Sequence, residues 1–89
     1  MAERRAVVGS RIGLHARPAA RFVKAAAKQP VKVTIAKAGA EPVDAASILD
    51  VVTLDVHGGE EVILTAEGDG AEQALDELVE VVEADHDAT

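Results

Sequence analysis

Hydrophobic and polar positions alternate strictly over residues 31–37, and in residues 4–9 apolar side chains can be divided between two faces with the same period. A period of two residues is typical of a half-buried β-strand, so both segments are predicted to be strands. The side chains expected to face the core are Ala6, Val8, Val31, Val33 and Ile35, with Val7 on the opposite face of the first strand.

Between these strands the pattern changes to the period of a helix. Apolar residues fall at i, i+3, i+4 and i+7, which predicts one buried stripe on an amphipathic helix. Pro18 fits the first turn, where its missing N–H costs nothing, and Pro30 cannot continue the helix. A loop over residues 10–14 is therefore expected to precede a helix that ends near Lys28 and Gln29. The stripe consists of Ala19, Phe22, Val23 and Ala26.

Two short elements follow the second strand. Residues 40–44 are predicted to form a strand at a sheet edge, because Pro42 has no N–H to donate to a neighbour. Residues 47–53 are predicted to form a short helix with Ser47 as N-cap. Asp50, three residues later, makes this a variant of the capping box.

A strand and a longer helix complete the pattern. Residues 61–67 are predicted to form a strand in which every second side chain faces the core. Asp69, followed three residues later by Glu72, is expected to cap the last helix. Residues 85–89 are expected to be a flexible tail. The inward positions of this strand and helix are Val62, Leu64, Ala66, Ala71, Ala74, Leu75, Leu78, Val81 and Val82.

The predicted order of elements is β-α-β-β-α-β-α. Because the connections are short, the four strands are expected to form one mainly antiparallel sheet with helices covering one face. The fold class is α+β, an open-faced two-layer sandwich. A chain of 89 residues is expected to be one domain, residues 1–89.

Composition excludes several function classes. There is no cysteine, so neither a disulfide framework nor a thiolate metal site is available. The net charge of −7 and the single aromatic residue, Phe22, argue against nucleic acid. The apolar runs are too short for a membrane span and no secretory signal is present, so a cytoplasmic protein without membrane insertion is expected.

Charge is distributed unevenly along the chain. All nine lysines and arginines lie between Arg4 and Lys37 with no acidic residue among them, and every later charged residue is Asp or Glu. A basic first half suits an anionic ligand or an acidic partner. Two solvated faces of opposite charge would give the same distribution, and charge alone does not separate these interpretations.

One segment carries candidate chemistry: Gly13-Leu14-His15-Ala16-Arg17-Pro18-Ala19. It places His15 at a helix N-terminus, where unpaired backbone N–H groups and the helix dipole favour a phosphate. The Arg17 guanidinium can pair with phosphate oxygens, and the positive charge favours a neutral, nucleophilic imidazole. Gly13 allows a tight turn before the histidine. The alternative, in which His15 caps the helix and Arg17 is solvated, is equally compatible with these residues.

The string GLHARPAA at residues 13–20 resembles, at every position, the active-site signature of the HPr family. These proteins are the histidine-containing phosphocarriers of the bacterial sugar phosphotransferase system. The resemblance extends through SILDVVTL from Ser47, EEVILTAEG and the acidic last helix, over nearly the whole chain. It implies a phosphocarrier rather than an enzyme, and neither a cofactor nor a metal.

The resemblance also implies roles for individual residues. His15 would be phosphorylated on Nδ1 by phospho-enzyme I, which is charged from phosphoenolpyruvate, and would pass the group to IIA domains of sugar permeases. Backbone N–H groups of Ala16 and Arg17 would hold the phosphate, assisted by the Arg17 side chain. Ser47 matches the serine that an HPr kinase/phosphorylase modifies in Gram-positive relatives, although an N-cap serine needs no such explanation.

An apolar patch with a basic rim is expected to bind the acidic surfaces of these partners. The patch residues are Ala20, Arg21, Lys24, Leu49 and Val52, with Arg17 beside them. An ordinary core position for Leu49 or Val52 is the alternative.

Some positions depart from the family pattern or have no expected role. Ile12 stands where many relatives have a small polar residue. Ala46 precedes Ser47 where lysine is common, and Asp50 stands where a small or basic residue is common. His57, in a turn, and His86, in the tail, are expected to be inert. A metal site at residues 85–87 is not expected, because adjacent tail residues rarely share one coordination geometry.

Alternative functions remain open at this point. Within the family, these are a nitrogen-related carrier and an HPr-like domain of a fused dihydroxyacetone kinase subunit. Outside it, they are a non-covalent binding module for an anion or a protein, and a small acyl phosphate hydrolase. A monomer is expected, because most apolar positions belong to the core.

Overall fold

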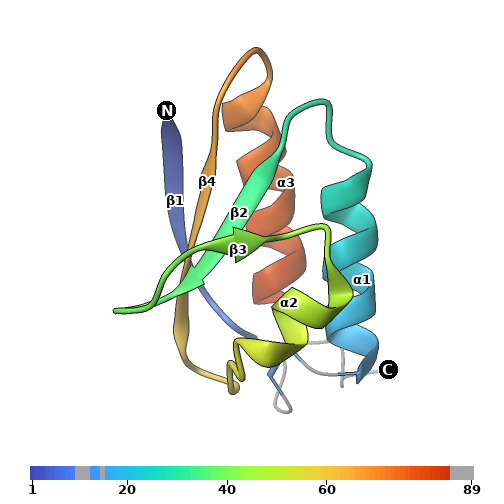
Figure 1. Ribbon diagram of the computed structural model, residues 1–89, viewed down its shortest axis with the longest axis vertical. Helices are drawn as coiled ribbons and strands as arrows, with labels where there is room; N and C mark the ends of the chain where they lie inside the picture. Colours follow the sequence, from blue (N-terminus) through green and yellow to red (C-terminus); the bar gives the residue numbers. More distant parts are fainter. Residues whose placement is uncertain (10–12, 15, 85–89) are drawn as a thin grey trace.

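The computed structural model describes residues 1–9, 13–14 and 16–84. Within them the elements follow the predicted order (Figure 1). They are β1 (Ala2–Val7), α1 (Ala16–Ala27), β2 (Val33–Lys37), β3 (Val43–Asp44), α2 (Ile48–Thr53), β4 (Glu61–Ala66) and α3 (Ala71–Glu83). The four strands form one sheet in the order β1-β4-β2-β3, and every neighbouring pair is antiparallel.

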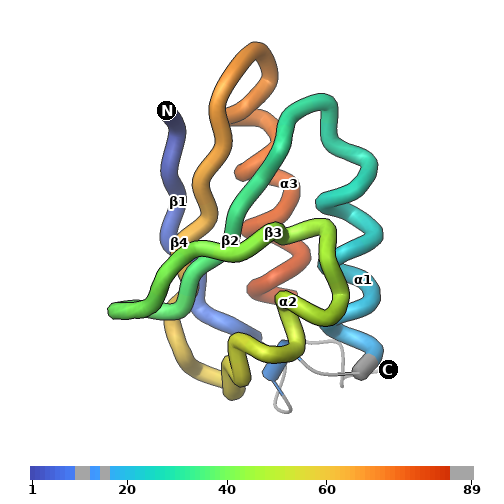
Figure 2. Tube along the Cα trace, viewed as in Figure 1, coloured from blue at the N-terminus to red at the C-terminus, as the bar shows by residue number. Residues whose placement is uncertain are grey.

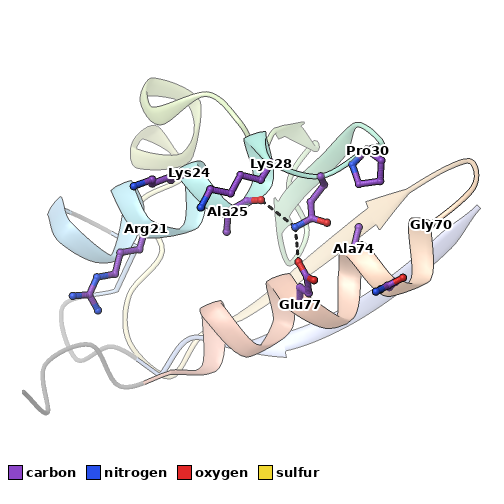
Figure 3. A pocket seen from close by; sticks show the side chains of 10 residues that line it. Arg21, Lys24, Ala25, Lys28, Pro30, Gly70, Ala74 and Glu77 are labelled. Atoms are coloured by element: carbon purple, nitrogen blue, oxygen red, sulfur yellow. Dashed lines mark hydrogen bonds between the residues drawn. The ribbon is translucent and has the colours of Figure 1, made fainter.

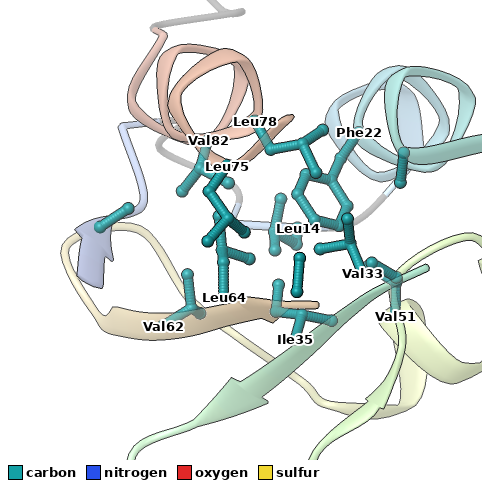
Figure 4. Close-up of a cluster of buried hydrophobic side chains, with 14 of the residues drawn as sticks. Leu14, Phe22, Val33, Ile35, Val51, Val62, Leu64, Leu75, Leu78 and Val82 are labelled. Atoms are coloured by element: carbon teal, nitrogen blue, oxygen red, sulfur yellow. The ribbon is translucent and has the colours of Figure 1, made fainter. Parts of the chain in front are cut away.

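Helices α1 and α3 lie on one face of the sheet and run in opposite directions, as the chain trace shows (Figure 2). The core fills the space between them and the sheet (Figure 4). Phe22 of α1 and Leu78 of α3 meet Leu64 and Ile35 of the central strands, and all four side chains are fully buried. The predicted α+β sandwich with one covered face is therefore confirmed.

The inward residues that the sequence pattern identified are mostly buried, including Ala6, Val8, Val33, Leu64 and Leu75. The exceptions are Val23, Val31 and Val81, which are half-buried at the margin of the core. Val31 lies before β2 rather than in it, because the turn and bend after α1 extend over residues 28–31.

The first strand was predicted two residues too late at each end, because it spans Ala2–Val7 rather than residues 4–9. Its start is hidden in the sequence by Arg4, a charged residue in register with the buried Leu64. The Arg4 guanidinium contacts two acids on α3, at 3.4 Å from Glu72 Oε1 and 3.3 Å from Asp76 Oδ1. Arg4 thus occupies an inward position of the strand that the pattern would assign to an apolar residue, and its charge is paired with acids on α3.

The prediction that Asp69 caps α3 is wrong. The N-cap is Gly70, with φ 88° and ψ 4°, and no side chain caps the helix there. A left-handed residue directly before the first turn favours glycine over aspartate, so the chain turns at Gly70.

The third strand is shorter than predicted, since only Val43–Asp44 pairs with β2. It lies at the sheet edge, as the missing N–H of Pro42 indicated.

Candidate functional site

The motif at residues 13–20 connects the end of β1 to helix α1, which begins at Ala16. Pro18 and Ala19 are buried and hold the first turn against the core, whereas Arg17 and Ala20 are exposed. His15 and Ile12 lie outside the described residues. The predicted role of His15 and the effect of Ile12 therefore stay predictions.

The two residues before His15 are fixed by the turn that precedes β4. Leu14 is 1 % exposed, and its N–H donates to the Val56 carbonyl at 3.0 Å. Gly13 has φ 79°, and a Cβ atom there would lie 2.0 Å from the same carbonyl oxygen. Only glycine satisfies both the conformation and the close approach, which gives a physical reason for the glycine in the motif.

The predicted partner-binding residues are all exposed. Leu49 and Val52 on α2 are 76 % and 37 % exposed, so neither is an ordinary core residue. Ala20, Arg21 and Lys24 are exposed on α1, against which α2 packs. The structure thus places these five residues on two adjacent helices, and Ile48, which the sequence analysis missed, is exposed beside them.

The basic side of α1 also borders a groove of about 600 Å³ between α1 and α3 (Figure 3). Arg21 and Lys24 line it from α1, and Lys28 lines it from the turn directly after α1. Gln29 also lines the groove, and its side-chain amide donates to the Ala25 carbonyl at 3.1 Å and to Glu77 Oε2 at 2.8 Å. The groove is thus a continuation of the basic rim.

Ser47 is the N-cap of α2, as predicted. Its hydroxyl accepts the Asp50 N–H at 3.4 Å. The reciprocal half of a capping box is absent among the described contacts, since the Ser47 N–H donates instead to the Asp44 carbonyl at 3.1 Å. The half-buried hydroxyl therefore has a structural role of its own, and its modification stays a prediction.

The turn before β4 contains polar contacts that the sequence did not indicate. The Glu60 carboxylate accepts the His57 N–H at 2.8 Å and lies 3.7 Å from Lys37 Nζ. The hydrogen bond from His57, and then the positive charges of Lys37 and His57, hold the pKa of Glu60 below its usual range. The His57 ring is 3.6 Å from Asp55 Oδ1, so this histidine has contacts although no chemistry was expected of it.

Among residues 1–9, 13–14 and 16–84, no group of three or more His, Asp or Glu side chains could hold a metal ion. His86 and the rest of residues 85–89 are outside that range. No helix in the described part of the chain is long and apolar enough to cross a bilayer.

The described structure thus combines an open-faced antiparallel sandwich with a glycine-anchored segment that leads into a helix N-terminus. A family model described as "PTS HPr component phosphorylation site" matches residues 2–84. The phosphocarrier protein HPr of Streptomyces coelicolor is 55% identical over 82 residues, which cover 92% of this chain and 88% of the relative. The chain belongs to the HPr family of phosphocarriers of the phosphotransferase system.

Solved structures agree with this assignment. HPr-C-His from Thermoanaerobacter tengcongensis superposes with a TM-score of 0.86 at 40% identity, covering 93% of this chain and 92% of its own. An HPr dimer from the same organism gives a TM-score of 0.70 at 44% identity, with 80% of each chain covered.

Proposed function

We propose that His15 is the phosphoryl acceptor and that the chain carries the group from phospho-enzyme I to IIA domains of sugar permeases, in the cytoplasm. In the first transfer the Nδ1 lone pair attacks phosphorus, the bond from phosphorus to the donor breaks, and the donor keeps the electron pair. In the second transfer a nucleophile of the acceptor protein attacks phosphorus, the Nδ1–P bond breaks, and His15 keeps the electron pair. The observation that carries this proposal is the glycine-anchored motif GLHARPAA at the start of α1, in a chain of the HPr family.

The neighbouring residues support this role. The first N–H groups of a helix have no partner within the helix, so those of Ala16 and Arg17 can hold an anion. The exposed Arg17 side chain adds a guanidinium that can pair with phosphate oxygens. The phosphoryl group would thus be stabilised by charge at the protein surface, where the next protein can reach it.

Enzyme I and the IIA domains would dock on the exposed residues of α1 and α2. Leu49 and Val52 supply apolar area, and Arg21 and Lys24 supply a basic rim for acidic partner surfaces. Each complex must dissociate after transfer, and a small patch suits such transient contacts.

The test is the intact mass of the chain after incubation with phosphoenolpyruvate and enzyme I. We expect a gain of one phosphoryl group that is lost in acid and absent from His15→Ala. Arg17→Ala should still be phosphorylated, but more slowly. A wild-type chain that gains no mass beside a known HPr that does would contradict the carrier role.

We further propose that Ser47 is a regulatory phosphorylation site for an HPr kinase/phosphorylase. A phosphate on an N-cap residue meets the positive end of a helix dipole, and it would add a dianion beside Leu49. We expect an acid-stable gain of one phosphoryl group with the kinase and ATP, absent from Ser47→Ala. The same modification should slow phosphorylation by enzyme I. An unchanged mass with an active kinase would contradict this role.

A further inference from the structure

The turn over residues 55–60 is bonded to the chain on both sides of residues 10–12. On one side, the Val8 N–H donates to the Glu60 carbonyl and the Gly59 N–H donates to the Val8 carbonyl, both at 2.9 Å. On the other side, the Leu14 N–H donates to the Val56 carbonyl at 3.0 Å. The backbone that leads into α1 is therefore held at both ends by this single turn, below the sheet in Figure 2.

The turn itself is held by side chains from within it and from β2. Glu60 reaches back to the His57 N–H at 2.8 Å, which closes the turn together with the hydrogen bond from the Glu60 N–H to the His57 carbonyl at 3.1 Å. Lys37 Nζ donates to the Asp55 carbonyl at 3.2 Å and lies 3.7 Å from Glu60 Oε2. Glu60 and Lys37 thus tie both ends of the turn to the central sheet.

The contact between the turn and the motif leaves little freedom. Val56 is fully buried, and its carbonyl both accepts the Leu14 N–H and blocks any side chain at residue 13. A shift of the turn must therefore move Gly13 and Leu14, the two residues directly before His15. A misplacement of about 1 Å, caused by a change far from the reacting atoms, is sufficient to slow a reaction that depends on alignment.

We propose that Glu60, supported by Lys37, is a positioning residue for phosphoryl transfer, which it serves by fixing the turn that holds Gly13 and Leu14. The described side-chain contacts of Glu60 are to His57 and Lys37, and Glu60 lies outside the residues proposed to bind enzyme I. Its loss should therefore slow the transfer step without weakening docking. This inference rests on the proposed phosphocarrier function and extends it to a residue in a different part of the sequence.

Glu61 provides a matched control. It is the adjacent glutamate, and its side chain is 42 % exposed against 37 % for Glu60. It pairs with Arg5 at 3.4 Å across two strands and makes no described bond to the 55–60 turn. Removing either carboxylate changes the net charge by the same amount, so a difference between the two variants reports the contacts of Glu60.

The experiment compares Glu60→Ala, Glu60→Gln, Lys37→Met and Glu61→Ala as substrates of phospho-enzyme I. For Glu60→Ala we expect kcat to fall about tenfold with KM within about twofold of wild type. Lys37→Met should also lower kcat, and Glu61→Ala should have the kcat and KM of wild type. Glu60→Gln keeps an oxygen that can accept the His57 N–H and should recover most of the rate.

A second readout follows the contact itself. Hydrogen exchange of the Leu14 amide should be about tenfold faster in Glu60→Ala than in Glu61→Ala, because its acceptor is no longer held. Exchange at Leu75, in the core of α3, serves as the reference for overall stability. A general loss of stability would accelerate both amides, whereas a positioning role affects Leu14 selectively.

The outcomes separate this inference from the function on which it rests. If wild type is not phosphorylated by enzyme I, the carrier function itself fails. If wild type is phosphorylated and Glu60→Ala equals Glu61→Ala in kcat and in Leu14 exchange, the function stands and the positioning role is wrong. A rise in KM with unchanged kcat would also overturn it, because Glu60 would then act in docking.

Discussion

Two constraints act on Gly13: its left-handed conformation and the close approach of the Val56 carbonyl. A second glycine of the chain has the first constraint without the second, so their energetic costs can be measured separately. Gly39 has φ 82°, close to the 79° of Gly13, but an added Cβ there would meet nothing within 4 Å. We predict that Gly39→Ala costs about 1 kcal/mol of unfolding free energy, which is the conformational penalty alone.

Gly13→Ala adds a steric clash with the Val56 carbonyl and should cost about 2–4 kcal/mol. Urea denaturation of both variants provides the measurement. Equal losses would mean that the backbone around Gly13 yields without strain. The close approach would then contribute nothing to the anchoring of the motif.

Glu60 should also make stability depend on pH. Its folded pKa lies below its usual range, so its contribution to stability is complete above the ordinary glutamate pKa of about 4.3. The contribution is lost as the pH falls through the lower folded pKa, because the carboxylate is then protonated in both states. The charges that face it are those of Lys37 and His57.

We therefore predict that wild type is more stable than Glu60→Gln at pH 7 and that the difference shrinks towards pH 3. Urea denaturation at a series of pH values measures it. A difference that stays constant over this range would show that the charge of Glu60 has no part in holding the turn.

At the scale of elements, helix α2 has two faces with different roles. Val51 is fully buried against the core, whereas Leu49 is 76 % exposed. We predict that Val51→Ala costs about 2 kcal/mol of stability, because it leaves a cavity. Leu49→Ala should change stability by less than about 0.5 kcal/mol.

Leu49→Ala should instead raise KM for enzyme I about tenfold, if this side chain is a central contact. Steady-state kinetics and thermal unfolding of the two variants test both halves of the prediction. A Leu49→Ala variant with unchanged KM would remove α2 from the proposed docking surface.

The element order and the core were predictable from sequence because they depend on local periodicity. The 3.6-residue pattern of α1 and the alternation in β4 each specify a buried face without reference to the rest of the chain. The start of α3 was not predictable in the same way. Asp69 and Gly70 are both acceptable before a helix, and only the turn geometry selects the glycine.

The motif around His15 was found because its residues are consecutive. The support behind it was missed because its parts come from separate segments: Lys37 from β2, Asp55 and Glu60 from the turn, and Leu14 from the motif. No local pattern relates a lysine to a glutamate that lies 23 positions further along the chain. The packing of β2 against β4 brings them together, and that pairing is a property of the folded sheet.

For the whole molecule, the uneven charge of the sequence becomes an arrangement in space. Arg21 and Lys24 of α1 border its groove with α3, and the five charged residues of α3 are all exposed acids. Two copies of the chain each carry a net charge of −7, and this repulsion disfavours their close association. Acidic partner surfaces, in contrast, can approach the basic side of α1.

Oligomeric state is the property of the whole molecule that these features predict most directly. The exposed large hydrophobic residues among those described are Met1, Val7, Ile48, Leu49 and Val52, of which three are on one short helix. A stable dimer needs about 800 Å² from each partner, which is far more than one turn of α2 supplies.

We predict a monomer of 9.2 kDa at micromolar concentration, measurable by sedimentation equilibrium. A mass twice as large at the same concentration would contradict this and would align the chain with the dimeric HPr of T. tengcongensis. A dimer interface that covered Ile48, Leu49 and Val52 would block the docking of enzyme I. If the chain dimerised and its rate of phosphorylation stayed constant over the concentration range of dimerisation, the interface would therefore lie on another face.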